Sequence, residues 1–334
     1  MTELASPPDA TALPTARLGA IRGLFREIGD LKRVRVAHAD GSAAQRAFVR
    51  AWAALVAGAD PGRVAAVECA AALAGARLAG VDAGVLVACG LPAADTVEVL
   101  GRAVDQVSGG LHPCAVARAH RTLPELVDAA TEAGVGTAGA GVRGGSGGGT
   151  ALASGALPPF VGALCRQPRA GATAPGRPRL IVEPPENHGE HCWAVAVYGA
   201  LLAEDLGADP GEAFLLGLAH HLHNAALPDA GFAGDTLLGE HVDALMMRLT
   251  ARELATLPAP LAARVEALLD RRADAATPVG RAFHAADVLD RVLQVHHHAR
   301  AAGFTADQAL VDLDLVHAGP VTDYHTAILA AADL

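Results

Sequence analysis

Aromatic residues, lysine and runs of one charge are scarce in this sequence of 334 residues. Only 3% of the residues are aromatic, whereas 51% are apolar and alanine is very common. Sandwiches and barrels depend on aromatic and β-branched residues in their strands, while small residues let helices pack closely. The composition therefore predicts an all-α protein, and the length allows two domains of ordinary size.

Lysine is almost absent, because Lys32 is the one lysine and arginine supplies the remaining basic charge. We attribute this usage to GC-rich coding and not to a device for binding phosphate. The net charge is −10, and the sequence has neither a basic run nor a basic face interleaved with aromatic residues. These features argue against nucleic acid as a partner.

The five cysteines are scattered and contain no CxxC pair, which is typical of free thiols in a reducing cytoplasm. The first residues lack the charged-then-apolar pattern of a signal peptide. The most apolar stretch, residues 64–90, is interrupted by Glu68, Arg77 and Asp82, so it does not resemble a membrane span. We therefore predict a cytoplasmic protein that does not bind membranes.

The first half of the chain has helical patterning but no chemical constellation. We expect a disordered lead over residues 1–16 and an N-terminal helical domain over residues 17–133. Ser42 is placed to cap a helix over 43–56, Asp60-Pro61 begins the next, and Pro124–Ala133 is expected to form a short helix. This half could act as a lid, a partner surface or a dimerisation unit, so a homodimer is one expectation.

Residues 134–179 are predicted to be a linker or mobile loop, because residues 134–155 hold ten glycines. A phosphate-cradling loop is the alternative, but no lysine–threonine pair follows the run Gly144–Gly149. The arginine-bearing stretch 158–179 is either an irregular connector or a loop whose arginines clamp an anionic substrate over a site. Arg169 is the candidate that we take from it.

Histidines mark two successive helices in residues 180–334. His191 lies near the start of a helix that we expect to run to about Leu206, where Gly207 ends it. Asp209-Pro210 begins the next helix, with His220 and His221 near its end. Two antiparallel helices joined by a short loop place the start of the first beside the end of the second. We therefore expect His191 to approach His220 and His221.

The run from Glu186 to Ala196, then Leu218-Ala219-His220-His221, then Ala286-Asp287, resembles the HD-domain metal-dependent phosphohydrolase superfamily. It is similar in particular to the nucleotidase-like branch, whose opening E-x-x-x-E-H-S-x-x-V-A is matched from Glu186 to Ala196. The likeness covers about residues 180–300 and implies an HD-like helical bundle to which an N-terminal helical region is added. It also implies that His191, His220, the residue at 221 and Asp287 hold a divalent metal, which activates water for attack on a phosphate ester.

The sequence departs from this family at His221, which stands where the signature aspartate is expected. A carboxylate can bridge two cations, whereas a neutral imidazole has one free lone pair. A dinuclear site is therefore weakened unless Asp229 or Glu240 contributes. A mononuclear site of three histidines and one aspartate is sound coordination chemistry for manganese, iron, cobalt, nickel or zinc.

Other polar residues are weaker candidates. Asp229 is most simply a turn residue but is also placed to act as a general acid or base. We favour His188 as a helix-start residue over a group that supports a ligand, and we keep it with Asp229 and Glu190 in the catalytic set. Asn224, like His223, either orients substrate or satisfies a buried polar end.

Surplus histidines raise an alternative chemistry. His241 follows the His220-His221 pair, and some members of the superfamily use extra histidines to bind two irons as oxygenases. The second histidine expected near residue 265 is missing, although His223 or His284 could substitute for it. The sequence thus favours hydrolysis of a small anionic phosphomonoester, which could be a nucleotide. The alternatives are a non-haem diiron oxygenase and a catalytically degenerate regulatory module.

Overall fold

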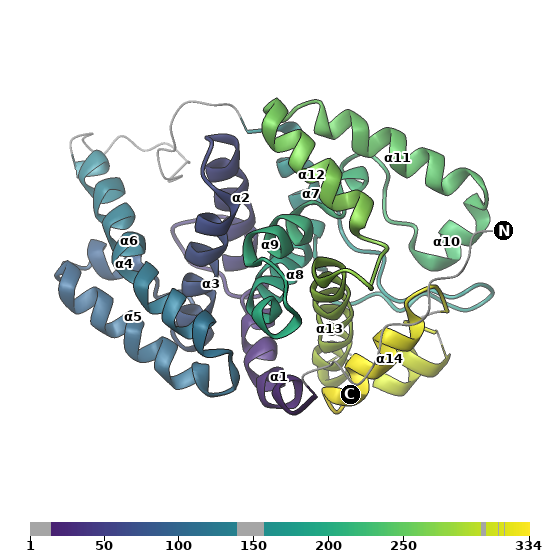
Figure 1. Ribbon diagram of the computed structural model, residues 1–334, viewed down its shortest axis with the longest axis horizontal. Coiled ribbons are helices and arrows are strands. Elements are labelled where there is room, and N and C mark those ends of the chain that lie inside the picture. The colour runs from purple at the N-terminus through teal and green to yellow at the C-terminus, as the bar shows by residue number, and fades with distance from the viewer. Residues whose placement is uncertain (1–14, 139–156, 302–304, 313, 317) are drawn as a thin grey trace.

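The computed structural model describes residues 15–138, 157–301, 305–312, 314–316 and 318–334. These residues form helices and no β-strand, which confirms the predicted all-α class (Figure 1). The α-helices are α1 (Thr15–Asp30), α2 (Ala43–Val56), α3 (Pro61–Leu78), α4 (Ala83–Ala88), α5 (Ala93–Val107), α6 (Pro113–Ala138), α7 (Pro159–Arg166), α8 (His188–Leu202), α9 (Pro210–Ala219), α10 (Gly231–Leu238), α11 (His241–Leu254), α12 (Ala259–Arg271), α13 (Pro278–Ala301) and α14 (Thr322–Ala331).

Helix α8 is the centre of the molecule, with α9 and α13 against it and α2 and α3 on the other side (Figure 1). Every residue of α8 is buried, and so is every residue of α9 except Pro210 and Glu212. A helix that is apolar on all sides cannot lie at a surface and must be covered by other helices. The first two turns of α8 and the end of α9 are therefore held in a dry, close-packed environment.

The α8–α9 contact is close because Gly217 meets the α8 backbone. A Cβ atom added at Gly217 would lie 2.5 Å from the Cα of Ala196 and 2.6 Å from its backbone nitrogen. Side chains larger than hydrogen at this point would separate the two helices. This close approach fixes the distance between the end of α9 and the start of α8.

Most predicted helix starts are observed. The side chains of Ser42, Asp60 and Asp209 all accept hydrogen bonds from backbone N–H groups in the first turns of α2, α3 and α9. Helix α8 is shorter than expected: it ends at Leu202, and a 3₁₀ turn, η3 (Glu204–Leu206), leads to Gly207 in the left-handed conformation.

Helices α6 and α7 also differ from the sequence-based expectation. Helix α6 begins at Pro113 and continues through Pro124, which we had expected to start a short helix. Leu123 and Val127 are buried on one face, so tertiary packing carries the helix past the proline. In the segment expected to be a linker, residues 159–166 form α7, and Phe160, Val161 and Leu164 are buried.

Two predictions lie outside the described residues. They are the disordered lead, apart from its last two residues, and the glycine-rich run that contains Gly144–Gly149. None of the described helices combines the length and the apolar character needed to cross a membrane.

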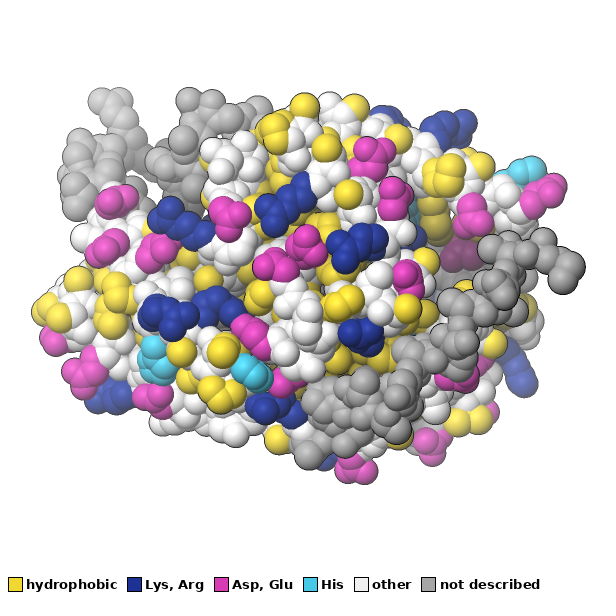
Figure 2. Space-filling model, in the orientation of Figure 1, with side chains coloured by type: hydrophobic (Ala, Val, Ile, Leu, Met, Phe, Trp, Pro, Cys, Tyr) yellow, Lys and Arg dark blue, Asp and Glu magenta, His cyan; other side chains and the backbone are white. Residues whose placement is uncertain are grey.

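Helices from the first half share one core with the histidine-bearing helices. Helices α2 and α3 pack against α8, and α3 also packs against α9. The ring of Phe25 in α1 stacks on Tyr198 in α8 with centroids 4.2 Å apart, and the Tyr198 hydroxyl donates to the Phe25 carbonyl. On the face shown in Figure 2, charged side chains of both signs are interspersed with apolar ones.

The Gly217 contact predicts a large stability difference between two glycine-to-alanine substitutions. Gly217→Ala should destabilise the protein by about 1–3 kcal/mol, because the added methyl group overpacks the α8–α9 interface. Gly23→Ala in α1 is the matched control: it is exposed, has nothing within 4 Å of an added Cβ, and should stabilise by about 0.5–1 kcal/mol. Urea unfolding measures both, and equal effects would contradict the proposed close contact.

Candidate metal centre

The start of α8 holds His191 in a fixed position. Asn187 caps the helix, and its side chain accepts from the backbone N–H of Glu190, while the Glu190 carboxylate accepts from the backbone N–H of Asn187. This capping box satisfies backbone donors that a helix start leaves free. His191 follows one residue later, fully buried.

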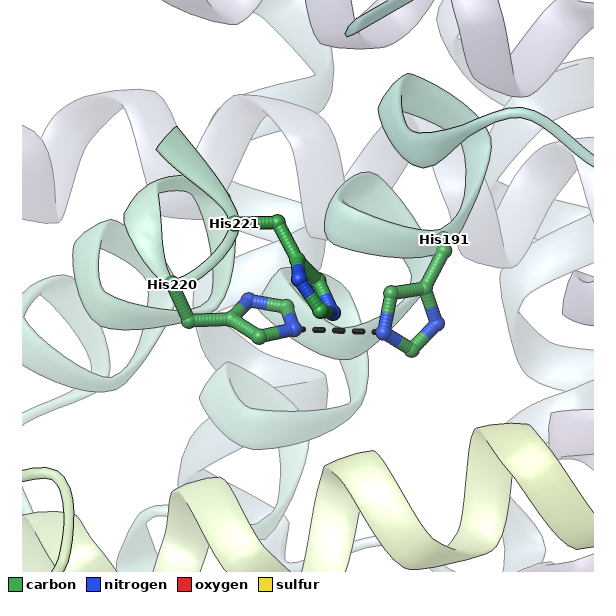
Figure 3. Close-up of side chains that lie close together, drawn as sticks. All are labelled: His191, His220 and His221. Atoms are coloured by element: carbon green, nitrogen blue, oxygen red, sulfur yellow. Dashed lines mark hydrogen bonds between the residues drawn. The ribbon is translucent and has the colours of Figure 1, made fainter. Parts of the chain in front are cut away.

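The end of α9 supplies the other two histidines. His220 is the C-cap residue of α9, and His221 leads into the 3₁₀ turn η4 (Leu222–Ala225). Because α8 and α9 are antiparallel and joined by a short loop, their start and end meet, as the sequence predicts. The three rings converge in Figure 3, and one potential ligand atom from each lies within 4.8 Å of the others.

The ring nitrogens of His191 and His220 face each other without a proton to share. His191 Nδ1 lies 2.7 Å from the Asp290 carboxylate, and His220 Nδ1 lies 2.7 Å from the Gly217 carbonyl. Each Nδ1 must donate, since its partner only accepts. In neutral rings both Nε2 atoms then carry lone pairs, and these atoms are 3.1 Å apart (Figure 3). Two such lone pairs repel each other unless a cation, either a proton or a metal ion, lies between them.

Asp287 brings a carboxylate to the same point from α13. Its Oδ1 lies 3.3 Å from His191 Nε2 and 4.0 Å from His220 Nε2. Ligands about 2.0–2.2 Å from one ion lie roughly 3.3–3.6 Å apart. The His191–Asp287 separation is within this range, while 3.1 Å and 4.0 Å lie just outside it, so small side-chain adjustments bring the three atoms around one divalent ion. A proton on His191 Nε2 can be donated to His220 Nε2 or to Asp287 Oδ1 but not fully to both, whereas a metal ion accepts a lone pair from all three atoms. The donor set therefore fits a metal.

His221 Nε2 is the third ring nitrogen of the cluster, but the Arg169 guanidinium already contacts it. Its Nδ1 donates to Asn224 Oδ1 at 2.8 Å, which leaves Nε2 with a lone pair. Arg169 Nη1 donates to that lone pair at 3.1 Å. One lone pair serves one partner, so His221 either accepts from Arg169 or ligates a metal.

Burial keeps the histidines in the form that binds metals. Desolvation lowers the pKa of His220 and of His221 well below the usual value, and the charge of a neighbouring histidine lowers each further. Burial alone would raise the pKa of the Asp287 carboxyl, but the contact with His191 and the charge of Arg291 outweigh it and hold that pKa well below its usual range. At neutral pH His220 and His221 are thus neutral imidazoles and Asp287 is an ionised carboxylate, which are the forms that bind metals.

The three predicted catalytic residues lie close to the centre, but two of them are engaged by structural contacts. Both Glu190 oxygens accept hydrogen bonds, one from the Asn187 backbone and one from the Ser42 hydroxyl at 2.5 Å. Asp229 accepts from the backbone N–H groups of Ala170 and Gly231 and so joins two loops. Both carboxylates thus have structural contacts, and their catalytic role stays a prediction.

His188 has an unexpected position. Its Nδ1 donates to the Gln167 carbonyl at 3.1 Å, while Nε2 is buried, has no hydrogen-bond partner among the described residues and lies 3.7 Å from Asp229 Oδ2. Its ring also packs edge-on against His221, with centroids 4.9 Å apart. Burial lowers the pKa of His188, and the charge of Arg169 lowers it further, so the ring is neutral and presents an acceptor to the site.

The predicted additional ligands do not join the cluster. His241 is exposed at the start of α11. His284 in α13 packs against Phe283 and has its Nδ1 3.4 Å from His325 Nε2. His223 contacts only the ring of His221 among the cluster residues, with centroids 5.6 Å apart. His223 lies in the 3₁₀ turn η4, after α9 has ended at Ala219.

Sequence reasoning missed the charged network behind His191. The Lys32 ammonium lies 2.5 Å from Glu186 Oε1 and 2.5 Å from Asp290 Oδ1. Potential ligand atoms of Glu186, His191 and Asp290 form a second group within 4.8 Å of one another. The signals were present, since Lys32 is the one lysine of the chain and Asp290 lies one helical turn after Asp287.

Comparison with known families agrees with this geometry. Residues 161–313 match the family model HD_3, described as an HD domain. The match covers somewhat less than half of the chain, contains the three histidines and both aspartates, and leaves α1 to α6 outside. It supports placing this part of the chain in the HD-domain superfamily and suggests a metal-dependent hydrolase. No curated protein and no solved structure matches the chain.

A histidine substitution tests the centre directly. His220→Ala should remove one of two facing acceptors and cause the protein to lose its bound metal, measured by elemental analysis and by titration with manganese, cobalt and zinc. His38→Ala is the matched control, because His38 is exposed and lies outside the cluster. Full metal content in the His220 variant would contradict the assignment.

The buried histidines also predict the pH dependence of stability. Burial lowers the pKa of His223 from 6.5 to about 4. Between these values the unfolded chain binds a proton that the folded chain does not, so this contribution is complete above about pH 6.5 and is lost as the pH falls towards 4, at ~1.4 kcal/mol per pH unit. His188, His220 and His221 act with the same sign.

The measurement is urea unfolding of the chelator-treated protein at about pH 7.5, 6 and 5, where the carboxylates with lowered pKa remain ionised. His223→Asn should reduce the slope by roughly one proton. A slope that is unchanged in this variant would show that His223 titrates normally in the folded state.

Proposed function

We propose that the protein is an HD-type metal-dependent phosphohydrolase that acts on a small phosphomonoester. The observation that carries the proposal is the convergence of His191 Nε2, His220 Nε2 and Asp287 Oδ1, three acceptors at separations that fit one divalent ion. The HD-domain match over residues 161–313 supports the hydrolase class. A nucleotide is the substrate that the likeness to the nucleotidase-like branch suggests.

In this proposal His191, His220 and Asp287 hold the metal, and His221 is the fourth candidate ligand. A divalent ion bound there would act as a Lewis acid and would lower the pKa of a bound water to about 7. The chain's own part is to keep the donors deprotonated and oriented. Asp290 and the Gly217 carbonyl fix which nitrogen of His191 and His220 carries the proton, and Asn224 does so for His221.

Arg169 is placed to bind the phosphate. Its guanidinium reaches the cluster at His221 Nε2, and its own backbone N–H donates to the Glu186 carbonyl, which anchors the loop before α8. A guanidinium matches two phosphate oxygens, and a phosphate binds it far more strongly than the neutral imidazole does. Substrate binding would therefore draw Arg169 away from His221, whose Nε2 lone pair then becomes free.

A single metal is the better fit for this chain. A second ion would need a bridging ligand, and a neutral imidazole at 221 cannot bridge. The cation beside His221 is the Arg169 guanidinium, whose charge can neutralise a phosphate as a second ion would. The diiron oxygenase alternative gains no support, because His241 is exposed and His284 faces His325.

The deciding experiment is anaerobic purification with metal analysis, followed by a phosphate-release assay on a panel of nucleoside monophosphates and simple phosphomonoesters. The proposal predicts about one equivalent of a divalent metal and metal-dependent phosphate release. Two irons with oxygen consumption and no phosphate release would favour the oxygenase. Metal binding or nucleotide binding without turnover would favour a regulatory module.

The Arg169→Gln variant tests the phosphate-binding role of Arg169 in the same assays. Loss of the guanidinium should raise KM at least about tenfold, because a charge-assisted phosphate contact is worth roughly 1.5–3 kcal/mol. Metal affinity should be retained or increased, since the competitor for the His221 lone pair is gone. Arg166→Gln, an exposed arginine of the same segment, is the control. A parallel loss of metal in the Arg169 variant would contradict this role.

A further inference from the structure

A buried ammonium sits directly behind the candidate metal centre. The Lys32 side chain is only 2% exposed and follows the end of α1, in the half of the chain that the HD-domain match leaves out. It contacts Glu186 Oε1 and Asp290 Oδ1, each at 2.5 Å. The other Asp290 oxygen lies 2.7 Å from His191 Nδ1. Lys32, Asp290 and His191 thus form one continuous line of contacts.

In this line of contacts, Lys32 acts on Asp290, and Asp290 acts on His191. Asp290 can hold the proton on His191 Nδ1 only while it is ionised and correctly turned, and this leaves the Nε2 lone pair facing His220 and Asp287. Two buried carboxylates without a cation would repel each other and favour protonation. Burial alone would lower the pKa of Lys32, but the charges of Asp290 and Glu186 outweigh it and raise that pKa.

The identity of the residue is informative because the chain otherwise uses arginine for its basic charge. An ammonium is a compact charge with three donors, and it fits between two carboxylates where a planar guanidinium needs more room. Glu186, His191 and Asp290 by themselves form a group that could hold a cation. The Lys32 ammonium occupies that position.

We propose that Lys32 is a positioning residue of the metal centre, which fixes Asp290 so that His191 presents its Nε2 lone pair to the metal. The inference rests on the metal site of the proposed function but does not depend on which reaction that site performs. It makes helix α1 and the turn after it a part of the centre, although the family match begins much later in the chain.

The test is metal affinity in Lys32→Met, which keeps an unbranched side chain and removes the charge. Loss of a group that orients a metal ligand weakens binding by about 10- to 100-fold, and we expect a change of that size by chelator competition. Lys32→Arg keeps the charge and should fall between wild type and Lys32→Met. A ¹⁵N spectrum of the metal-free protein should show His191 as one tautomer in wild type and as a mixture in Lys32→Met.

Two further variants separate positioning from general stability. Arg118→Met breaks the ion pair with Glu204, which lies just beyond the opposite end of α8, and should leave metal affinity unchanged. Lys32→Met combined with Glu186→Gln removes the surplus buried charge and should restore folding where the single variant is unstable. The double variant should still bind metal at least tenfold more weakly, since Asp290 is no longer held.

The outcomes distinguish this inference from the proposed function. Wild-type protein that binds no divalent metal would overturn the metal centre and the inference with it. Wild-type binding together with unchanged affinity in the folded double variant would overturn only the role of Lys32. Weaker binding with a disturbed His191 tautomer supports the inference even where no phosphate is released.

Discussion

The structure depends on two imidazole nitrogens that face each other 3.1 Å apart inside a helix pair. In neutral rings neither nitrogen has a proton to offer, because Asp290 and the Gly217 carbonyl each accept the proton on the opposite side of the ring. Burial makes charging the His220 ring costly. A close α8–α9 contact at Gly217 keeps the rings from separating. Packing therefore holds together two nitrogen lone pairs that repel each other. A cation bound between them would remove this repulsion.

Around this pair the charges are ordered in layers. Asp287 adds a carboxylate beside the rings, Asp290 supports His191 from behind, and Lys32 balances Asp290 and Glu186. On the side of His221, the Arg169 guanidinium lies against the cluster. The buried ammonium and the guanidinium thus flank the carboxylates, which lets several charges coexist in a region with little water.

The sequence predicts those parts of the structure that follow from local chemistry. Asp209-Pro210 and Ser42 were correctly placed at helix starts, and antiparallel helices across a short loop were enough to bring His191 beside His220 and His221. The sequence-based prediction was wrong where packing overrides local preference, as in α6, which continues through Pro124. It also missed contacts between distant segments, since nothing local to Lys32 indicates Glu186 or Asp290, more than 150 positions away.

The Ser42 hydroxyl has one further consequence. It caps α2 through the Gln45 N–H and donates to Glu190, the residue that closes the capping box of α8. One small side chain thus ties together the starts of two helices that are far apart in the chain. The segment that matches the HD domain is consequently not a portable unit here. Cut away from α1 and α2, it would carry unbalanced carboxylates and a loosened first turn, so its boundaries in evolution need not coincide with its boundaries in folding.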